Sequence, residues 1–107
     1  MARALLVVRA VVLQTDRSAF DVWYSREHLP DAMKAFQVRR AWRAWSRTEP
    51  GVHCAVYEFN SADAAEAVNE SDVVKPLVAE FDRRWGSSVT RSREVLEIVD
   101  EQGERSA

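Results

Sequence analysis

Apolar residues occupy both alternating faces of residues 4–13, ALLVVRAVVL, and this pattern predicts a β-strand buried on both sides. Successive side chains of a strand point to opposite faces. One face carries Leu5, Val7, Val11 and Leu13, and the other carries Leu6, Val8, Ala10 and Val12. We therefore expect other layers of structure to cover both faces of this strand.

An amphipathic helix is predicted next, with Thr15 or Asp16 as its N-cap. Its inward face, defined by helical spacing, carries Phe20, Trp23, Tyr24, Glu27 and His28. Pro30 lacks an N–H and disfavours helical geometry at the residue before it. We therefore expect the helix to break between His28 and Pro30, with its aromatic residues facing the sheet and Glu27 solvated.

Three further strands and two further helical segments follow from the same patterns. The strands are expected at residues 38–47, 52–59 and 88–99, with the turn TEPG joining the first two. Helices are expected after Asn60 or Ser61, and again between Ser71 and Gly86. This order, β-α-β-β-α-β, predicts a ferredoxin-like α+β fold, an antiparallel four-stranded sheet with helices on one face. We expect residues 1–101 to form this single domain and residues 102–107 a flexible C-terminal tail.

The face of the sheet that lies away from the helices is predicted to remain apolar. A chain of 107 residues has no further helices with which to cover it. A second copy of the chain, packed sheet to sheet, would cover this face. The sequence therefore predicts a homodimer.

Composition narrows the range of partners and compartments. The chain is 47% hydrophobic and 30% charged, with a formal net charge of −2, so no general attraction to nucleic acid or to anionic membranes is expected. The apolar start is interrupted by Arg9 and carries no cleavage pattern, so we expect a strand and not a signal peptide or membrane span. The single cysteine, Cys54, excludes an internal disulfide framework and fits a cytoplasmic location.

His28 and Tyr24 are the candidate catalytic residues. A histidine with an ordinary pKa near ~6.5 suits proton transfer at neutral pH. Tyr24 lies one helical turn earlier and could donate a hydrogen bond to the imidazole or to a bound compound. The alternative is a structural histidine that binds backbone carbonyls at the expected helix break. His53 shares a strand face with Tyr57 and could meet His28 across the gap between helix and sheet.

No metal or cofactor site is expected. The two histidines and Glu27 do not have the spacing of a known metal motif, and the three glycines form no phosphate-binding loop. Cys54 points away from His53 on its strand, so the two are not expected to form a nucleophile pair. Arg39, Arg43 and Arg47 form a basic row, for which Glu94 or Glu97 is the expected partner.

Four segments, WYSREHLP, HCAVYEF, KPLVAEFDRRWG and VTRSREVLEIV, together resemble the dimeric α+β barrel superfamily, and most closely its EthD-like and related uncharacterised members. The resemblance implies two four-stranded sheets joined across a dimer, with a pocket between each sheet and its helices. The helix-end histidine of EthD-like proteins corresponds to His28, and the adjoining aromatic positions correspond to Trp23 and Tyr24. The superfamily includes cofactor-independent monooxygenases, isomerases, cyclases and haem-degrading enzymes, so the fold alone does not fix an activity.

Three functional hypotheses remain open. The first is a cofactor-independent enzyme acting on a small hydrophobic, oxygenated compound, with His28 as acid/base, Tyr24 as hydrogen-bond donor, and Trp23, His53 and Tyr57 as substrate-binding residues. The second is a non-catalytic dimeric small-molecule-binding or stress-related protein, and the third and lowest is a haem-handling protein. A cavity that contains both His28 and Tyr24 would favour the enzyme, and a filled interior would favour the binding protein.

Overall fold

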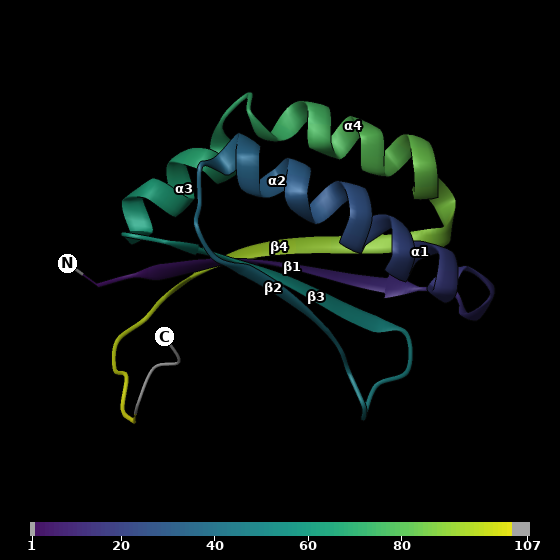
Figure 1. The fold of residues 1–107 in the computed structure, drawn as a ribbon, viewed down its shortest axis with the longest axis horizontal. Helices are drawn as coiled ribbons and strands as arrows, with labels where there is room; N and C mark the ends of the chain where they lie inside the picture. The colour runs from purple at the N-terminus through teal and green to yellow at the C-terminus, as the bar shows by residue number, and fades with distance from the viewer. Residues whose placement is uncertain (1, 104–107) are drawn as a thin grey trace.

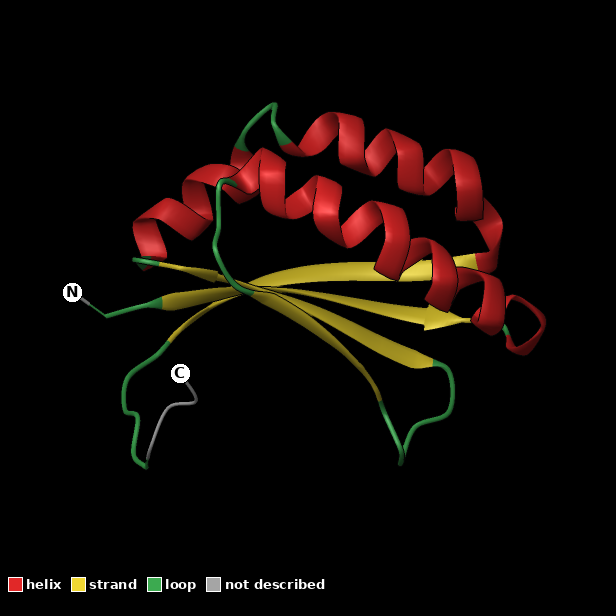
Figure 2. Ribbon diagram, in the orientation of Figure 1, coloured by secondary structure: helices red, strands yellow, loops and turns green. Residues whose placement is uncertain are grey.

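The computed structural model, which describes residues 2–103, contains one antiparallel four-stranded sheet with all of its long helices on the same face (Figures 1 and 2). The strands are β1 (Ala4–Val12), β2 (Ala41–Trp45), β3 (Val52–Phe59) and β4 (Val89–Glu97). The α-helices are α1 (Arg17–Trp23), α2 (Leu29–Phe36), α3 (Ala62–Glu70) and α4 (Val74–Trp85). Short 3₁₀ turns η1 (Gln14–Asp16) and η3 (Gly86–Ser88) and a π turn η2 (Tyr24–His28) complete the element order.

The strand order is β2-β3-β1-β4, and every neighbouring pair is antiparallel. This arrangement confirms the ferredoxin-like α+β fold that the order of elements predicted. The bounds of the second predicted strand are the least accurate, because β2 spans only residues 41–45 of the expected 38–47. β4 lies at one edge of the sheet and β2 at the other, so residues on these two strands do not meet.

The predicted break between His28 and Pro30 is wrong. His28 and Leu29 both have right-handed helical geometry, and the chain passes from α1 through η2 into α2 without interruption (Figure 1). The N–H of Leu29 donates to the carbonyl of Tyr24, five residues back. Pro30 cannot donate to this ladder, and a π turn shifts the backbone hydrogen bonds by one residue just before the proline. The helix therefore accommodates Pro30 by widening and does not end there.

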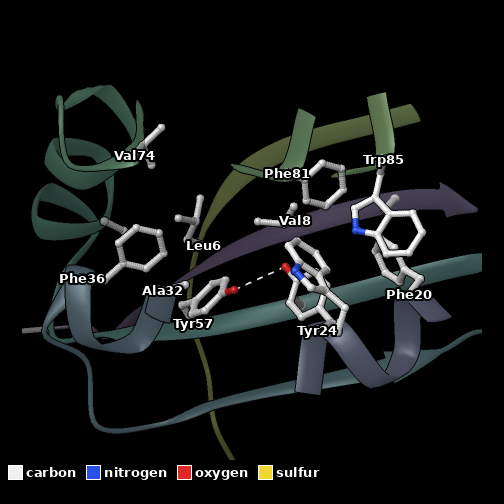
Figure 3. Packing of buried hydrophobic residues seen from close by; sticks show 14 of the residues in the cluster. Leu6, Val8, Phe20, Tyr24, Ala32, Phe36, Tyr57, Val74, Phe81 and Trp85 are labelled. Carbon is white, nitrogen blue, oxygen red and sulfur yellow. Dashed lines mark hydrogen bonds between the residues drawn. The ribbon is translucent and has the colours of Figure 1, made fainter. Parts of the chain in front are cut away.

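The two faces of β1 have different environments. Its inward residues Leu6 and Val8 are buried beneath the helices (Figure 3), and Val12 on the same face is also buried. On the opposite face Leu5 and Val7 are only half-buried, and 42% of Val11 is exposed. The chain covers one side of a strand that is apolar on both sides.

The predicted flexible tail at residues 102–107 lies, apart from Gln102 and Gly103, outside the described residues. Within residues 2–103, no helix has both the length and the apolar character needed to cross a membrane.

Candidate functional site

A small cavity lies between the inner face of the sheet and the helices η2, α2 and α4. Its enclosed part measures about 30 Å³, and the unfilled space reaches about 370 Å³ when the mouth that opens to solvent is included. The enclosed part has room for an ordered water. The lining residues are Leu6, Val8, Tyr24, His28, Ala32, Phe36, Tyr57, Val74, Leu77, Val78, Arg91 and Arg93. The walls are thus mostly aliphatic, with a few polar groups among them.

His28 reaches this cavity from the end of the π turn η2. Its imidazole stacks on the indole of Trp23, with ring centroids 4.6 Å apart and planes inclined by 22°. The ring of Tyr24 meets it edge-on at 4.8 Å. Among the described residues, no group hydrogen-bonds to the imidazole, although only 8% of the residue is exposed. His28 is therefore held in place by aromatic packing and does not cap backbone carbonyls.

The imidazole of His28 is uncharged at neutral pH. Burial lowers the pKa of His28 from 6.5 to about 4, and the nearby guanidinium of Arg91 lowers it further than burial alone would. The carboxylates of Asp31 and Glu80 oppose this shift but do not cancel it. A neutral imidazole has one nitrogen with a free lone pair. His28 can therefore accept a proton inside the cavity.

Tyr24 and Tyr57 contribute a pair of hydroxyls to the same cavity, with their oxygens 3.3 Å apart (Figure 3). Burial raises the pKa of Tyr24 to about 12 and raises the pKa of Tyr57 further, so both hydroxyls stay protonated. One hydroxyl donates to the other, which uses only one of the two protons. The second proton is available to an acceptor in the cavity, and Tyr24 thus donates to Tyr57 or to a bound molecule, not to His28.

His53 belongs to a separate polar network beneath α1. It has no exposed surface, and its Nε2 lies 3.3 Å from Nη1 of Arg43. Because Arg43 can only donate, Nε2 accepts and Nδ1 carries the proton, with no partner among the described groups. Burial first, and then Arg43, lowers the pKa of His53 to about 4. Arg43 in turn donates to Oδ1 of Asp21 at 2.7 Å, and the indole N–H of Trp45 donates to the same oxygen at 2.7 Å.

The contacts of Arg43 differ from those predicted for the basic row of arginines to which it belongs. Glu94 and Glu97 were predicted to pair with it, but they lie on β4 at the far edge of the sheet. The partner of Arg43 is Asp21 of α1, and these two hydrogen bonds hold the pKa of Asp21 below its usual range. The network therefore ties α1 to the hairpin β2–β3.

The structure brings together three of the five predicted site residues. Tyr24, His28 and Tyr57 line the cavity, whereas Trp23 lies behind the imidazole and His53 lies behind the ring of Tyr24. Sequence reasoning missed the two charged lining residues, Arg91 and Arg93, which both lie on β4. The sequence did contain a signal for this pair. Alternate residues of a strand share one face, so Arg91 and Arg93 of the strand predicted at 88–99 had to lie on the same face of the sheet.

The positions of the metal-ligating side chains and the size of the cavity limit which metals and cofactors the site can hold. Within residues 2–103, no group of three or more His, Cys, Asp and Glu side chains is arranged to hold a metal ion. The cavity beside His28 is far too small for a haem ring.

Comparisons with known proteins identify the fold. No protein-family model matches this chain, and no curated protein sequence matches it. Solved structures do match over most of its length. A variant of SnoaB, a cofactor-independent oxygenase from Streptomyces nogalater, superimposes with a TM-score of 0.67 and 13% identity, over 97% of this chain and 100% of its own.

Two further solved structures superimpose on this chain. An EthD-family protein from Bacillus halodurans gives a TM-score of 0.63 at 16% identity, covering 85% of this chain and 96% of its own. A conserved protein of unknown function from Bacteroides thetaiotaomicron gives 0.63 at 15% identity, covering 91% and 98%. Identities this low establish the fold and no more. The chain therefore has the ferredoxin-like α+β fold of these structures, and an EthD-family protein is among them, as the resemblance to EthD-like proteins predicted.

Proposed function

We propose that this protein is a cofactor-independent enzyme that acts on a small hydrophobic, oxygenated compound and uses His28 to remove a proton. The observation that carries the proposal is the cavity itself. It places an unpaired, neutral imidazole and a tyrosine pair among aliphatic walls. A mostly apolar pocket with a few convergent polar groups is the usual form of a small-molecule site.

The proposed chemistry begins with proton transfer. The free nitrogen of His28 accepts a proton from an acidic O–H or C–H of the compound, and an imidazolium and an organic anion result. Tyr24 or Tyr57 donates its spare hydroxyl proton as a hydrogen bond to the oxygen on which the negative charge develops. Trp23 and His53 support this arrangement from behind, because Trp23 stacks on the imidazole and His53 packs against Tyr24.

An oxygenation is the first reaction to test. SnoaB is a cofactor-independent oxygenase, and this chain has the same fold. Removal of a proton makes a phenol or an enolisable ketone electron-rich, and such an anion is the species that can react with dioxygen without a cofactor. The residues of the cavity need only bind the compound, take the proton and stabilise the anion.

A non-catalytic small-molecule-binding protein is the second candidate. The small enclosed volume, about 30 Å³, favours it, because a sizeable substrate must use the mouth or displace side chains. We also propose that the protein works as a homodimer joined through the outer face of the sheet; a cytoplasmic location stays a prediction.

The test replaces His28 by Gln, which keeps a polar side chain but cannot act as a base. We expect His28→Gln to lower turnover of responsive phenolic or polyketide-like compounds by roughly 10²–10⁴-fold, the usual contribution of general base catalysis. Oxygen consumption measures turnover, and the fluorescence of Trp23, which stacks on the imidazole, reports binding. The matched control is Glu27→Gln, because Glu27 is the exposed neighbour and its variant should behave as the wild type.

Unchanged turnover in folded His28→Gln protein would refute the catalytic role. Binding without turnover in the wild type, across the whole panel and in the presence of dioxygen, would leave the binding protein as the better description.

A further inference from the structure

Two arginines, Arg91 and Arg93, form one wall of the cavity. They are alternate residues of β4, so both point to the inner face of the sheet. β4 is an edge strand, and Arg93 both lines the cavity and is exposed to solvent. Arg93 therefore stands at the mouth of the cavity, with Arg91 beside it. Two cations at the opening of an aliphatic pocket are not explained by the proton transfer proposed above.

Arg91 is fixed in position by residues of α4. Its guanidinium lies 3.3 Å from a carboxylate oxygen of Asp82 and 4.4 Å from the centre of the Phe81 ring. Only 20% of its side chain is exposed. Its charge also reaches the polar groups of the cavity, because it lowers the pKa of both His28 and Tyr24. Arg91 thus places a positive charge beside the polar groups of the cavity, which favours an anionic occupant.

Arg93 differs from Arg91 in having no ion pair among the described residues. Partial burial, and then the charge of Arg91, lower the pKa of its guanidinium. Of the two arginines only Arg91 pairs with a carboxylate, that of Asp82, so the wall keeps an excess positive charge. A planar guanidinium binds a carboxylate through two parallel hydrogen bonds.

We propose that the ligand of this cavity carries a carboxylate, which Arg93 and Arg91 bind at the mouth while its hydroxyl or carbonyl group reaches the Tyr24–Tyr57 pair. The ligand class is a small aromatic or enolisable hydroxy- or keto-acid. The proposal rests on the cavity of the proposed function, but it does not require turnover. It adds a specificity determinant on β4 to the groups that do the chemistry.

Charged residues on an edge strand have another ordinary use, which is to prevent edge-to-edge association of sheets. That use requires only that the residue be charged and exposed. It predicts no preference between an acid and its neutral analogue in the cavity. The comparison of matched ligands therefore separates the two explanations.

The experiment measures binding of 4-hydroxybenzoate and 4-hydroxybenzamide by tryptophan fluorescence and calorimetry. The two compounds have nearly the same shape and differ in charge. We expect the wild type to bind the acid roughly 10-fold more tightly than the amide, as a charge-assisted hydrogen bond provides. The preference should shrink as ionic strength rises, because the mouth of the cavity is open to screening.

Three variants sharpen the test. Arg93→Gln should reduce the preference for the acid to about 2-fold or less, and Arg93→Lys should restore part of it, since a lysine keeps the charge but not the paired geometry. Arg47→Gln is the control with the same change in net charge, because Arg47 is exposed near the opposite edge of the sheet. It should keep the full preference. Arg93 and Arg47 are exposed, so we expect their variants to fold, and melting curves check it.

Equal binding of acid and amide by the wild type, or an unchanged preference in Arg93→Gln, overturns the proposal. His28→Gln distinguishes it from the proposed function. That variant should lose turnover and keep the preference for the acid, whereas Arg93→Gln should lose the preference for the acid.

Discussion

At the scale of single residues, His28 and His53 are two buried imidazoles in one aromatic cluster, and each has a pKa near 4. Neither finds an acid that would stabilise its charged form directly. Arg91 faces His28 and Arg43 faces His53, so the nearest strong charges oppose protonation; Asp31, Glu80 and Asp21 act in the other direction and are weaker. The cluster therefore favours the neutral form of both imidazoles.

This arrangement predicts that acid destabilises the fold well above the pH at which carboxylates titrate. In the unfolded chain each histidine binds a proton near pH 6.5, whereas in the folded chain it does so only near pH 4. Between these values the unfolded state binds more protons, so the free energy of unfolding falls as the pH falls. A shift from 6.5 to about 4 corresponds to about 3 kcal/mol per histidine.

Urea unfolding at a series of pH values between 7 and about 4 measures this loss directly. His28→Gln should remove about half of the pH dependence, and Glu27→Gln should leave it intact. A free energy of unfolding that stays constant from pH 6.5 to pH 4 would mean that both imidazoles are solvated, contrary to the packing around them.

At the scale of elements, the hairpin turn before β3 depends on Gly51. Its φ is +85°, and a Cβ at this position would lie 2.7 Å from the carbonyl oxygen of Val12 and 2.5 Å from a guanidinium nitrogen of Arg17. The carbonyl of Gly51 also accepts a hydrogen bond from the N–H of Val12 at 2.8 Å. The turn is thus pressed against the end of β1, where a side chain has no room.

We expect Gly51→Ala to lower the free energy of unfolding by roughly 1–3 kcal/mol, from backbone strain together with the steric conflict. Gly86→Ala is the matched control. Gly86 also has a positive φ, +29°, but nothing lies within 4 Å of its Cβ position, so the control carries backbone strain without the conflict. Equal melting temperatures for the two variants would show that the close approach to Val12 is not maintained.

The elements also show what the sequence alone can and cannot predict. Alternation and helical spacing located all four strands and placed Phe20, Trp23, Tyr24 and His28 against the sheet, because burial follows these periods directly. The π turn was not predictable, since Pro30 is compatible with either a break or a wider turn, and tertiary packing decides between them. The pairing of Arg43 with Asp21 depends on strand order, which spacing within one strand does not contain.

At the scale of the whole molecule, the outer face of the sheet is an uncovered apolar surface. Val7 of β1 lies at its centre, between Val56 of β3 and Glu94 of β4, and Trp42 of β2 pairs with Val56. At its edges 39% of Trp42 and 42% of Leu96 are exposed. The helices all lie on the other side, as Figure 2 shows. Exposed apolar side chains gathered on one face in this way are typical of an interface.

A second copy of the chain is the occupant that this face fits best. The face is apolar around Val7 and Val56 and carries a charged pair, Arg9 and Glu49, and two such faces can pack as layers of a sandwich. A closed twofold dimer brings the same residues of both copies together at the centre of the interface. We expect a total buried area of roughly 1,200–2,000 Å² or more, as in stable complexes.

The prediction is that the protein, whose chain has a mass of 12.2 kDa, sediments at micromolar concentration with twice that mass. Val7→Lys should convert it to a monomer, because two buried lysines would face each other at the centre of the interface without partners. Val22→Lys is the matched control, since Val22 is an apolar residue of α1 that is 49% exposed on the helical side. It should remain dimeric. Circular dichroism of both variants confirms that the fold survives, because Val7 faces away from the helices. Wild-type protein that sediments as a 12.2 kDa species would exclude the dimer and leave the outer face for a different partner.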